Sequence, residues 1–246
     1  MYLTIQGIVL RVTDYNDRDA LLTVLSRNHG KLTVKARGLR RKNSPLIAPC
    51  QLLAFGEFTL FEYRGMYTVN EAHSLELFQH LRRDLTKLSL GTYFAQATEV
   101  ISQEDLPNPE LLALLLNSLY ALNTLDLPEN QVKAAFELRL ACLAGYTPEV
   151  SSCHLCGSAT PDRFDLSAGQ TECAGCGNGC GGIRMPVNPG ILQAMQYICL
   201  CDSKKLFAFS LGEENMQALS SLTEAYLTTQ LERGFSTLDF YKSLLI

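Results

Sequence analysis

Two pairs of cysteines carry the clearest chemical signal in the sequence. Cys153 and Cys156 form one Cys-x-x-Cys motif, Cys173 and Cys176 form a second, and sixteen residues separate the two motifs. This spacing allows two tight turns to present four thiolates tetrahedrally, which is the geometry of structural zinc sites. The sequence therefore predicts one structural zinc ion held by these four cysteines. Because four thiolates fill the coordination sphere, no position remains for a catalytic water.

Other interpretations of the cysteine cluster stay open at this point. A redox dithiol, buried cysteines without a metal and an iron–sulfur site use the same residue type. Cys180 or His154 can also replace one of the four ligands. Gly157, Gly175 and Gly177 lie beside the motifs and suit tight turns, since glycine adopts positive φ without a Cβ clash. Zinc is expected to fold this segment, which has few apolar residues to bury.

A basic stretch near the N-terminus is the second candidate site. No Asp or Glu occurs between Ala20 and Gly56, whereas seven Lys and Arg do. A run of charge is usually a solvated face, but several of these residues alternate along a predicted strand and therefore share one side of it. Such a row of cations can follow a phosphate backbone. The predicted nucleic-acid-binding residues are Lys31, Lys35, Arg37, Arg40, Arg41 and Lys42.

Aromatic residues near these cations provide possible platforms on which bases of a single strand stack. The candidates are Tyr15, Phe61, Tyr63 and Tyr67. The alternative is that their rings fill the interior of the barrel, because the sequence alone does not fix the register of the strands.

Five short strands are predicted to position the cations. Each combines β-branched or aromatic residues with partial alternation, and turn residues separate them. Five strands in about 75 residues predict a small closed barrel, for which the OB-fold is the common solution. The predicted strands are Thr4–Val12, Asp19–Ser26, Lys31–Arg37, Leu52–Tyr63 and Tyr67–Ala72.

From Leu81 the apolar residues recur at helical spacing, until Pro107 to Pro109 interrupts the pattern. The fold class predicted is α+β: a five-stranded OB-fold barrel at 1–80, then a helical domain at 81–246, which a four-cysteine zinc ribbon at 150–184 interrupts. Gly145 is the predicted cap of one helix. The further predicted helices are Glu110–Leu125, Glu129–Ala144, Asn188–Leu200 and Glu213–Arg233.

The composition is that of a globular protein, with 47% hydrophobic and 19% charged residues. The longest apolar run, Leu111 to Leu116, is far shorter than the ~20 residues that span a bilayer, so neither a membrane segment nor a secretory signal is expected. Paired cysteines without such a signal favour metal binding in a reducing compartment. Residues 1–80 contain ten Lys and Arg against seven Asp and Glu, and the rest contains eleven against eighteen, so the two parts are expected to meet different partners.

Several segments in a fixed order resemble the bacterial RecO family of DNA repair proteins. Gly30-Lys31-Leu32 leads into the run from Lys35 to Ser44, a helical region follows, and Cys153 to Gly157 comes next. The resemblance covers nearly the whole chain and includes Arg163 to Asp165, Ala168 to Gln170 and Asn188 to Gly190. Glu172 departs from the family pattern, where an apolar residue is expected before the third cysteine, and so does Cys180.

The resemblance implies a recombination mediator of the bacterial cytoplasm, associated with the nucleoid. The OB-fold is then expected to bind single- and double-stranded DNA and to anneal complementary strands without ATP. The protein is expected to work with RecR in loading RecA onto strands coated by single-strand-binding protein. The helical domain is expected to receive the acidic C-terminal tail of single-strand-binding protein. The basic candidates for that tail are Arg82, Arg83, Lys87, Lys133 and Arg139.

Two other function classes remain as alternatives. One is a zinc-ribbon adaptor that binds RNA or associates with transcription. The other is a zinc hydrolase that uses fewer cysteines together with His154 and a nearby carboxylate. No Gly-x-x-x-x-Gly-Lys-Ser/Thr loop for a nucleotide is present, and the sequence favours a binding protein over an enzyme.

Overall fold

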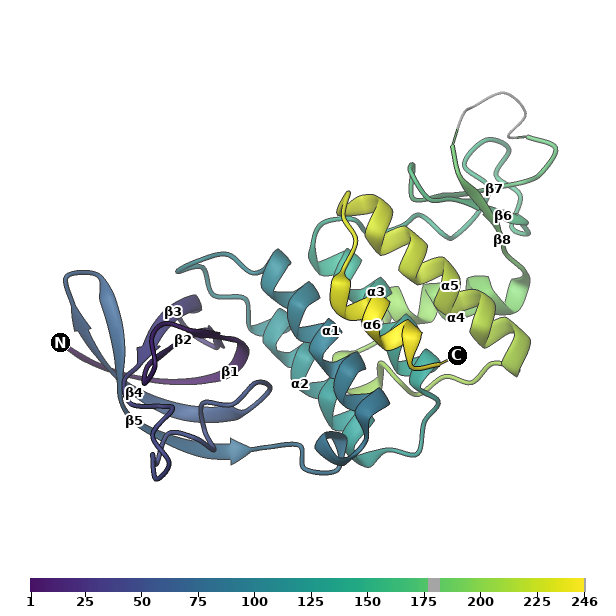
Figure 1. Cartoon of the computed structure of the whole chain (residues 1–246). Coiled ribbons are helices and arrows are strands. Elements are labelled where there is room, and N and C mark those ends of the chain that lie inside the picture. Colours follow the sequence, from purple (N-terminus) through teal and green to yellow (C-terminus); the bar gives the residue numbers. More distant parts are fainter. Residues whose placement is uncertain (177–181, 246) are drawn as a thin grey trace. The chain divides into compact units, whose positions relative to one another are not determined.

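The computed structural model describes residues 1–176 and 182–245, and it divides into two compact units. The first unit comprises Met1–Leu125 together with Phe235–Ile246, and the second comprises Asp126–Gly234. Figure 1 shows the elements of both units along the chain. No helix in the described ranges has the length and apolar character needed to cross a bilayer.

The first unit begins with a closed five-stranded barrel. Its strands hydrogen-bond in the order β1-β2-β3-β5-β4, and β1 pairs with β4 to close the barrel. The pairing of β3 with β5 is parallel and the other pairings are antiparallel. This arrangement confirms the predicted OB-like barrel. The strands are β1 (Tyr2–Asp14), β2 (Ala20–Ser26), β3 (Gly30–Ala36), β4 (Phe55–Tyr63) and β5 (Met66–Glu76).

Alternation along β3 separates the barrel core from the cations. Leu32 and Val34 point into the core and are buried, whereas Lys31, Thr33 and Lys35 lie on the outer side. The strand ends at Ala36, one residue earlier than predicted, and Arg37 begins the following turn. The pleat therefore fixes which side chains face solvent.

Helices cover one part of the barrel surface. Helix α1 (Leu85–Ile101) packs against β1, and α2 (Pro109–Thr124) packs against β2. Short polar side chains cap the N-termini of both helices. Asp84 accepts a hydrogen bond from the Thr86 N–H, and Asn108 accepts one from the Leu111 N–H. A 3₁₀ turn at Leu81–Arg83 precedes α1. The helix therefore begins at Leu85, four residues after Leu81, where the helical spacing of apolar residues starts.

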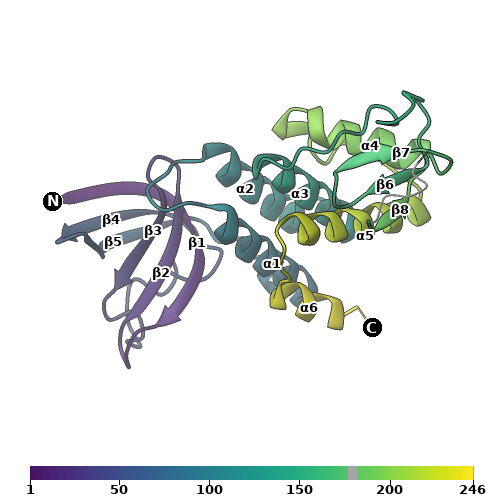
Figure 2. The same ribbon diagram turned by 90° about the horizontal axis from the view of Figure 1, so that it is seen from above.

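A short C-terminal helix, α6 (Ser236–Ser243), returns to the first unit and was not predicted. It runs beside α1 in both ribbon views (Figures 1 and 2). Thr237 Oγ1 donates to Gln96 Oε1 at 2.5 Å, and Phe235 packs edge-on against Tyr93 with ring centroids 5.4 Å apart. Eight residues contain too few turns for a distinct apolar period, so tertiary packing selects this helix.

In its described residues the second unit contains three α-helices, a 3₁₀ turn at Ser203–Lys205 and a small sheet. Helix α3 (Glu129–Leu143) packs against α4 (Pro189–Leu200) and α5 (Glu213–Gln230). Gly145 follows α3 with φ +94°, which confirms its predicted role as a cap. The sheet has the order β7-β6-β8 and belongs to the ribbon. Its antiparallel strands are β6 (Arg163–Asp165), β7 (Gln170–Glu172) and β8 (Arg184–Pro186).

The compact units divide the chain at a different place from the predicted domain boundary after residue 80. Because α1 and α2 pack against the barrel strands, they group with the barrel rather than with α3, α4 and α5. The ribbon lies wholly within the second unit, between α3 and α4.

Candidate metal centre and nucleic-acid interface

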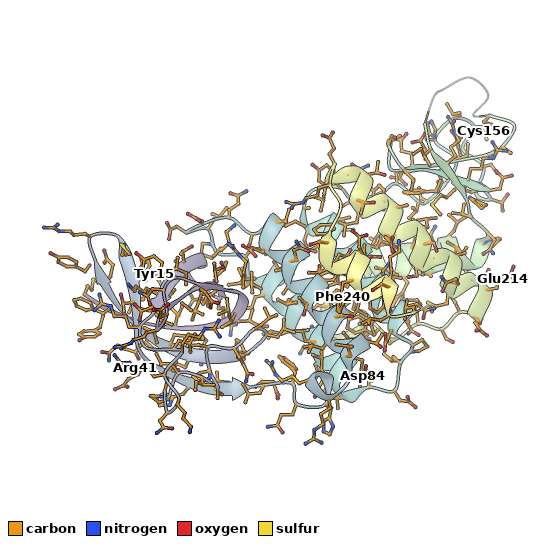
Figure 3. All side chains as sticks on the ribbon, in the orientation of Figure 1. Tyr15, Arg41, Asp84, Cys156, Glu214 and Phe240 are labelled. Carbon is orange, nitrogen blue, oxygen red and sulfur yellow. The ribbon has the colours of Figure 1, made fainter. Side chains whose placement is uncertain are left out.

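The four predicted zinc ligands lie together. The Sγ atoms of Cys153, Cys156, Cys173 and Cys176 are all within 4.8 Å of one another, and Cys156 Sγ lies 3.9 Å from Cys173 Sγ. A tetrahedral site with Zn–S bonds of about 2.3 Å requires S–S separations of about 3.8 Å. The donor set and its spacing therefore fit a four-thiolate zinc ion, and Figure 3 places Cys156 in the ribbon.

Local backbone hydrogen bonds form the two turns that carry the thiols. In the first turn Gly157 N–H donates to the Cys153 carbonyl at 2.9 Å, and Gly157 has φ +74°, a conformation that glycine adopts without strain. In the second turn Cys176 N–H donates to the Cys173 carbonyl at 2.9 Å. Gly175 does not need positive φ, and Gly177 lies outside the described residues.

Backbone N–H groups around Cys153 favour the ionised form of its thiol. Hydrogen bonds from backbone N–H groups, that of Cys156 first, lower the pKa of Cys153 to about 6. The Cys173 N–H lies 3.3 Å from Cys153 Sγ and contributes to this effect. These dipoles stabilise a thiolate, which is the form that binds zinc.

The proposed substitutes for a zinc ligand have different outcomes. His154 does not belong to the sulfur cluster: its ring Nδ1 lies 3.1 Å from the Thr171 carbonyl oxygen, and its backbone N–H donates to the same carbonyl at 3.0 Å. The ring is thus held by the backbone of β7. Cys180 lies outside the described residues.

Glu172, which departs from the family pattern, has a partner in the ribbon. Its side chain is buried and forms an ion pair with Arg184 Nε. Arg184 NH2 also approaches Asp165 at 3.8 Å. A buried carboxylate is stabilised by such a guanidinium, and here the pair joins β7 to β8 beside the third cysteine.

Three of the six predicted nucleic-acid-binding residues already have partners in the first unit. Lys31 Nζ donates to the Glu99 carbonyl of α1 at 3.3 Å. Lys35 pairs with Asp19 at 3.2 Å, and Arg40 pairs with Asp14. The backbone N–H of Gly38, and to a lesser extent Lys35, lowers the pKa of Asp19, which keeps this carboxylate ionised. No Asp or Glu occurs within this stretch of the sequence, but in the folded chain Asp14 and Asp19 lie beside two of its cations.

The other three predicted residues follow β3 in an exposed loop. The side chains of Arg37, Arg41 and Lys42 form no ion pair within the described part of the chain. Figure 3 shows Arg41 on the surface of the barrel. The sequence reasoning missed one further exposed cation, Arg18, whose carbonyl accepts the backbone N–H of Arg40. Arg18 lies between Asp17 and Asp19 in the sequence and therefore belongs to no basic run. The role of these cations in binding DNA stays a prediction.

Most of the aromatic candidates lie outside the barrel core. Tyr15 and Tyr63 are exposed, and Phe61 is 40% exposed, whereas Tyr67 packs partly against the core. Lys35 Nζ lies 4.3 Å from the centre of the Tyr15 ring. The sequence reasoning missed Tyr2, whose ring centroid lies 5.3 Å from that of Phe61 across the β1–β4 pairing. Tyr2 and Phe61 are direct partners in the register of β1 and β4, and this pairing brings the two rings together.

Three of the five cations considered for an acidic peptide tail have structural partners. Lys133 is buried and pairs with Glu137 at 3.0 Å and Glu224 at 2.8 Å. Arg82 donates to the carbonyls of Leu77 and Leu52, each at 2.5 Å, and burial lowers its pKa. Arg139 donates to the Cys201 carbonyl at 2.7 Å. The remaining candidates, Arg83 and Lys87, form no ion pair among the described residues.

Comparison with known families matches both parts of the chain. The model described as "Recombination protein O N terminal" matches residues 1–78, and "Recombination protein O C terminal" matches residues 82–239. The chain belongs to the RecO family of DNA repair proteins. The predicted resemblance is thus confirmed over nearly the full length.

Individual RecO relatives match from end to end. "DNA repair protein RecO" of Acetivibrio thermocellus is 35% identical over 246 residues, which is 99% of this chain and 97% of that protein. The protein of the same name from Alkaliphilus metalliredigens is 28% identical over 99% of this chain and all of its own length, and that from Thermoanaerobacter sp. is 26% identical over 98% of each. RecO membership places the chain in DNA repair and recombination.

Proposed function

We propose that this RecO-family chain is a recombination mediator that binds single- and double-stranded DNA and anneals complementary strands without ATP. One observation carries the proposal: a closed barrel presents Arg37, Arg41 and Lys42 in an exposed loop, without an acidic partner among the described residues. Unpaired cations of this kind bind phosphates and release counterions.

Annealing follows from the same electrostatics. Two complementary strands repel each other through their phosphates, and cations that contact both strands reduce this repulsion. In this proposal the side chains bind and position DNA, and no bond is made or broken, so the chain is not an enzyme. The ribbon has a structural role, since four thiolates leave no open position on a zinc ion.

Exposed rings provide a second type of contact for a single strand. Tyr2 and Phe61 lie against each other at the outer surface of β1 and β4, and Tyr63 is 60% exposed further along β4. Bases stack on such rings with about 1–3 kcal/mol per base, whatever their identity. The combination of cations and rings suits binding without sequence preference.

The same proposal includes protein partners. The chain is proposed to act with RecR in loading RecA, in the bacterial cytoplasm at the nucleoid. For the acidic tail of single-strand-binding protein, Arg83 and Lys87 are the cations without an ion pair in the described ranges, and Leu85 between them is exposed. A cation beside an exposed apolar side chain suits a peptide that ends in apolar residues and a carboxylate.

ATP-free annealing of complementary DNA oligonucleotides by the zinc-loaded chain tests the proposal. The expected result is faster annealing that weakens with salt and is lost when Arg37, Arg41 and Lys42 are changed to alanine. Replacing Lys204 and Lys205, which lie in the second unit, gives a control with lost charge at a different place. A wild-type chain that does not bind DNA at low salt, or that prefers RNA, would overturn the proposal and favour the RNA adaptor.

A further inference from the structure

Three cysteines outside the ribbon gather where α3 and α4 end. Cys142 lies in the last turn of α3, Cys199 lies near the end of α4, and Cys201 follows α4. Cys142 Sγ and Cys199 Sγ are 3.7 Å apart, and both residues are partly exposed and carry free thiols. Neither sulfur belongs to the four-thiol cluster of the ribbon.

The two thiols are chemically unequal. A hydrogen bond with Cys199, with smaller contributions from Thr147 and the Arg139 guanidinium, lowers the pKa of Cys142 to about 7. The pKa of Cys199 is raised, chiefly by the same hydrogen bond and by burial. The two sulfurs, 3.7 Å apart, share one proton, and the thiolate is assigned to Cys142, whose pKa is the lowered one.

Arg139 contacts the third cysteine, Cys201, directly. It lies one helical turn before Cys142 on α3, and its NH2 group donates to the carbonyl of Cys201 at 2.7 Å and contacts Cys201 Sγ at 3.2 Å. The guanidinium thus holds Cys201, and its charge favours the thiolate form of both Cys142 and Cys199. A thiolate with a cation and a second thiol in van der Waals contact is the arrangement of a reactive dithiol.

We propose that Cys142 and Cys199 form a peroxide-reactive dithiol that closes to a disulfide between α3 and α4. The Cys142 thiolate attacks one oxygen of hydrogen peroxide, the O–O bond breaks, and the products are a sulfenic acid and hydroxide, which takes up a proton to become water. The Cys199 sulfur then attacks the sulfenic sulfur, an S–S bond forms, and the S–O bond breaks. The proton of Cys199 leaves with the released hydroxide as a second water.

The geometry needs only a small movement to close this bond. The sulfurs must approach from 3.7 Å to about 2.05 Å, and each lies at a helix end, where fewer backbone hydrogen bonds restrain the chain. The two cysteines are 57 positions apart in the sequence, and the whole ribbon lies between them. The disulfide therefore closes the loop that carries the ribbon.

Treatment of the zinc-loaded full-length chain with hydrogen peroxide tests the proposal by alkylation and peptide mass spectrometry. The expected product is one peptide pair linked through Cys142 and Cys199. Cys50 is the internal reference: it is buried with a pKa raised to about 12, and it should stay reduced. A zinc indicator dye in a parallel sample reports whether the ribbon keeps its metal during the reaction.

Three variants separate the roles of the cysteines. Cys199→Ser should stop the reaction at a sulfenic acid on Cys142, which a 1,3-dione reagent traps. Cys142→Ser should abolish both the disulfide and the trapped product. Cys201→Ser is the matched control and should still form the Cys142–Cys199 link. The proposal is overturned if the Cys142–Cys199 link does not form in the peroxide-treated chain, or if the sulfenic acid is trapped on Cys199 rather than on Cys142.

Discussion

Changing Arg37, Arg41 and Lys42 together to alanine is expected to flatten the salt dependence of DNA binding. These three cations are exposed and form no ion pair in the described part of the chain. Each phosphate contact contributes about 0.9 to the slope of log K against log salt for duplex DNA and about 0.7 for a single strand. If each residue contacts one phosphate, the slope decreases by about 2.7 for duplex and about 2.1 for single-stranded DNA.

These slopes correspond to a large change in measurable affinity. When salt rises fourfold, from about 50 to about 200 mM, a difference of 2.7 in slope means that the variant loses about 40-fold less duplex affinity than the wild type over that range. For a single strand the corresponding factor is about 18-fold. Fluorescence anisotropy of a labelled oligonucleotide at four or five salt concentrations resolves differences of this size, and circular dichroism verifies the fold of each variant.

The Arg40–Asp14 ion pair provides the matched control. Changing both residues to alanine removes one positive and one negative charge from the neighbouring surface and leaves the net charge unchanged. Because Asp14 already neutralises Arg40, the slope is expected to change by less than about 0.5. An unchanged slope in the triple variant, or an equal decrease in the control, would refute the assignment of phosphate contacts to the exposed loop.

Two further predictions concern the second unit. Cys156→Ser is expected to lower bound zinc from one ion per chain towards none and to expose the ribbon to proteolysis while the barrel keeps its far-ultraviolet spectrum; full zinc occupancy would contradict the ligand set. Lys133→Met leaves the buried Glu137 without its ammonium partner and is expected to cost about 3–5 kcal/mol in urea unfolding, whereas Lys133→Met with Glu137→Leu should recover most of it. Equal loss in the single and double variants would count against this pair.

Local sequence patterns predicted most of the secondary structure. Alternation in segments such as Lys31–Arg37 predicted the strands of the barrel, and apolar residues at helical spacing predicted α2 and α3 to within a residue or two. Such elements follow from short-range periodicity, which a sequence displays directly. The two Cys-x-x-Cys motifs predicted the thiol cluster for the same reason, because each tight turn is a local structure.

Elements that depend on distant contacts were harder to predict. Helix α6 is only eight residues long, and its packing against α1 involves Gln96, far away in the sequence. The grouping of α1 and α2 with the barrel likewise depends on helix–strand packing rather than on the change in period at Leu81. Short elements gain most of their stability from tertiary contacts, which the local pattern does not contain.

The sequence by itself determined the set of cations and thiols and the strands and turns that carry them. Only the tertiary structure decided which of them are available. Asp14 and Asp19 precede the acid-free stretch in the sequence, but strand pairing brings them to Arg40 and Lys35, and helix packing brings Cys142 to Cys199. The free energy of an ion pair or a thiol contact depends on distance in space, and that distance is set by the fold rather than by separation along the chain.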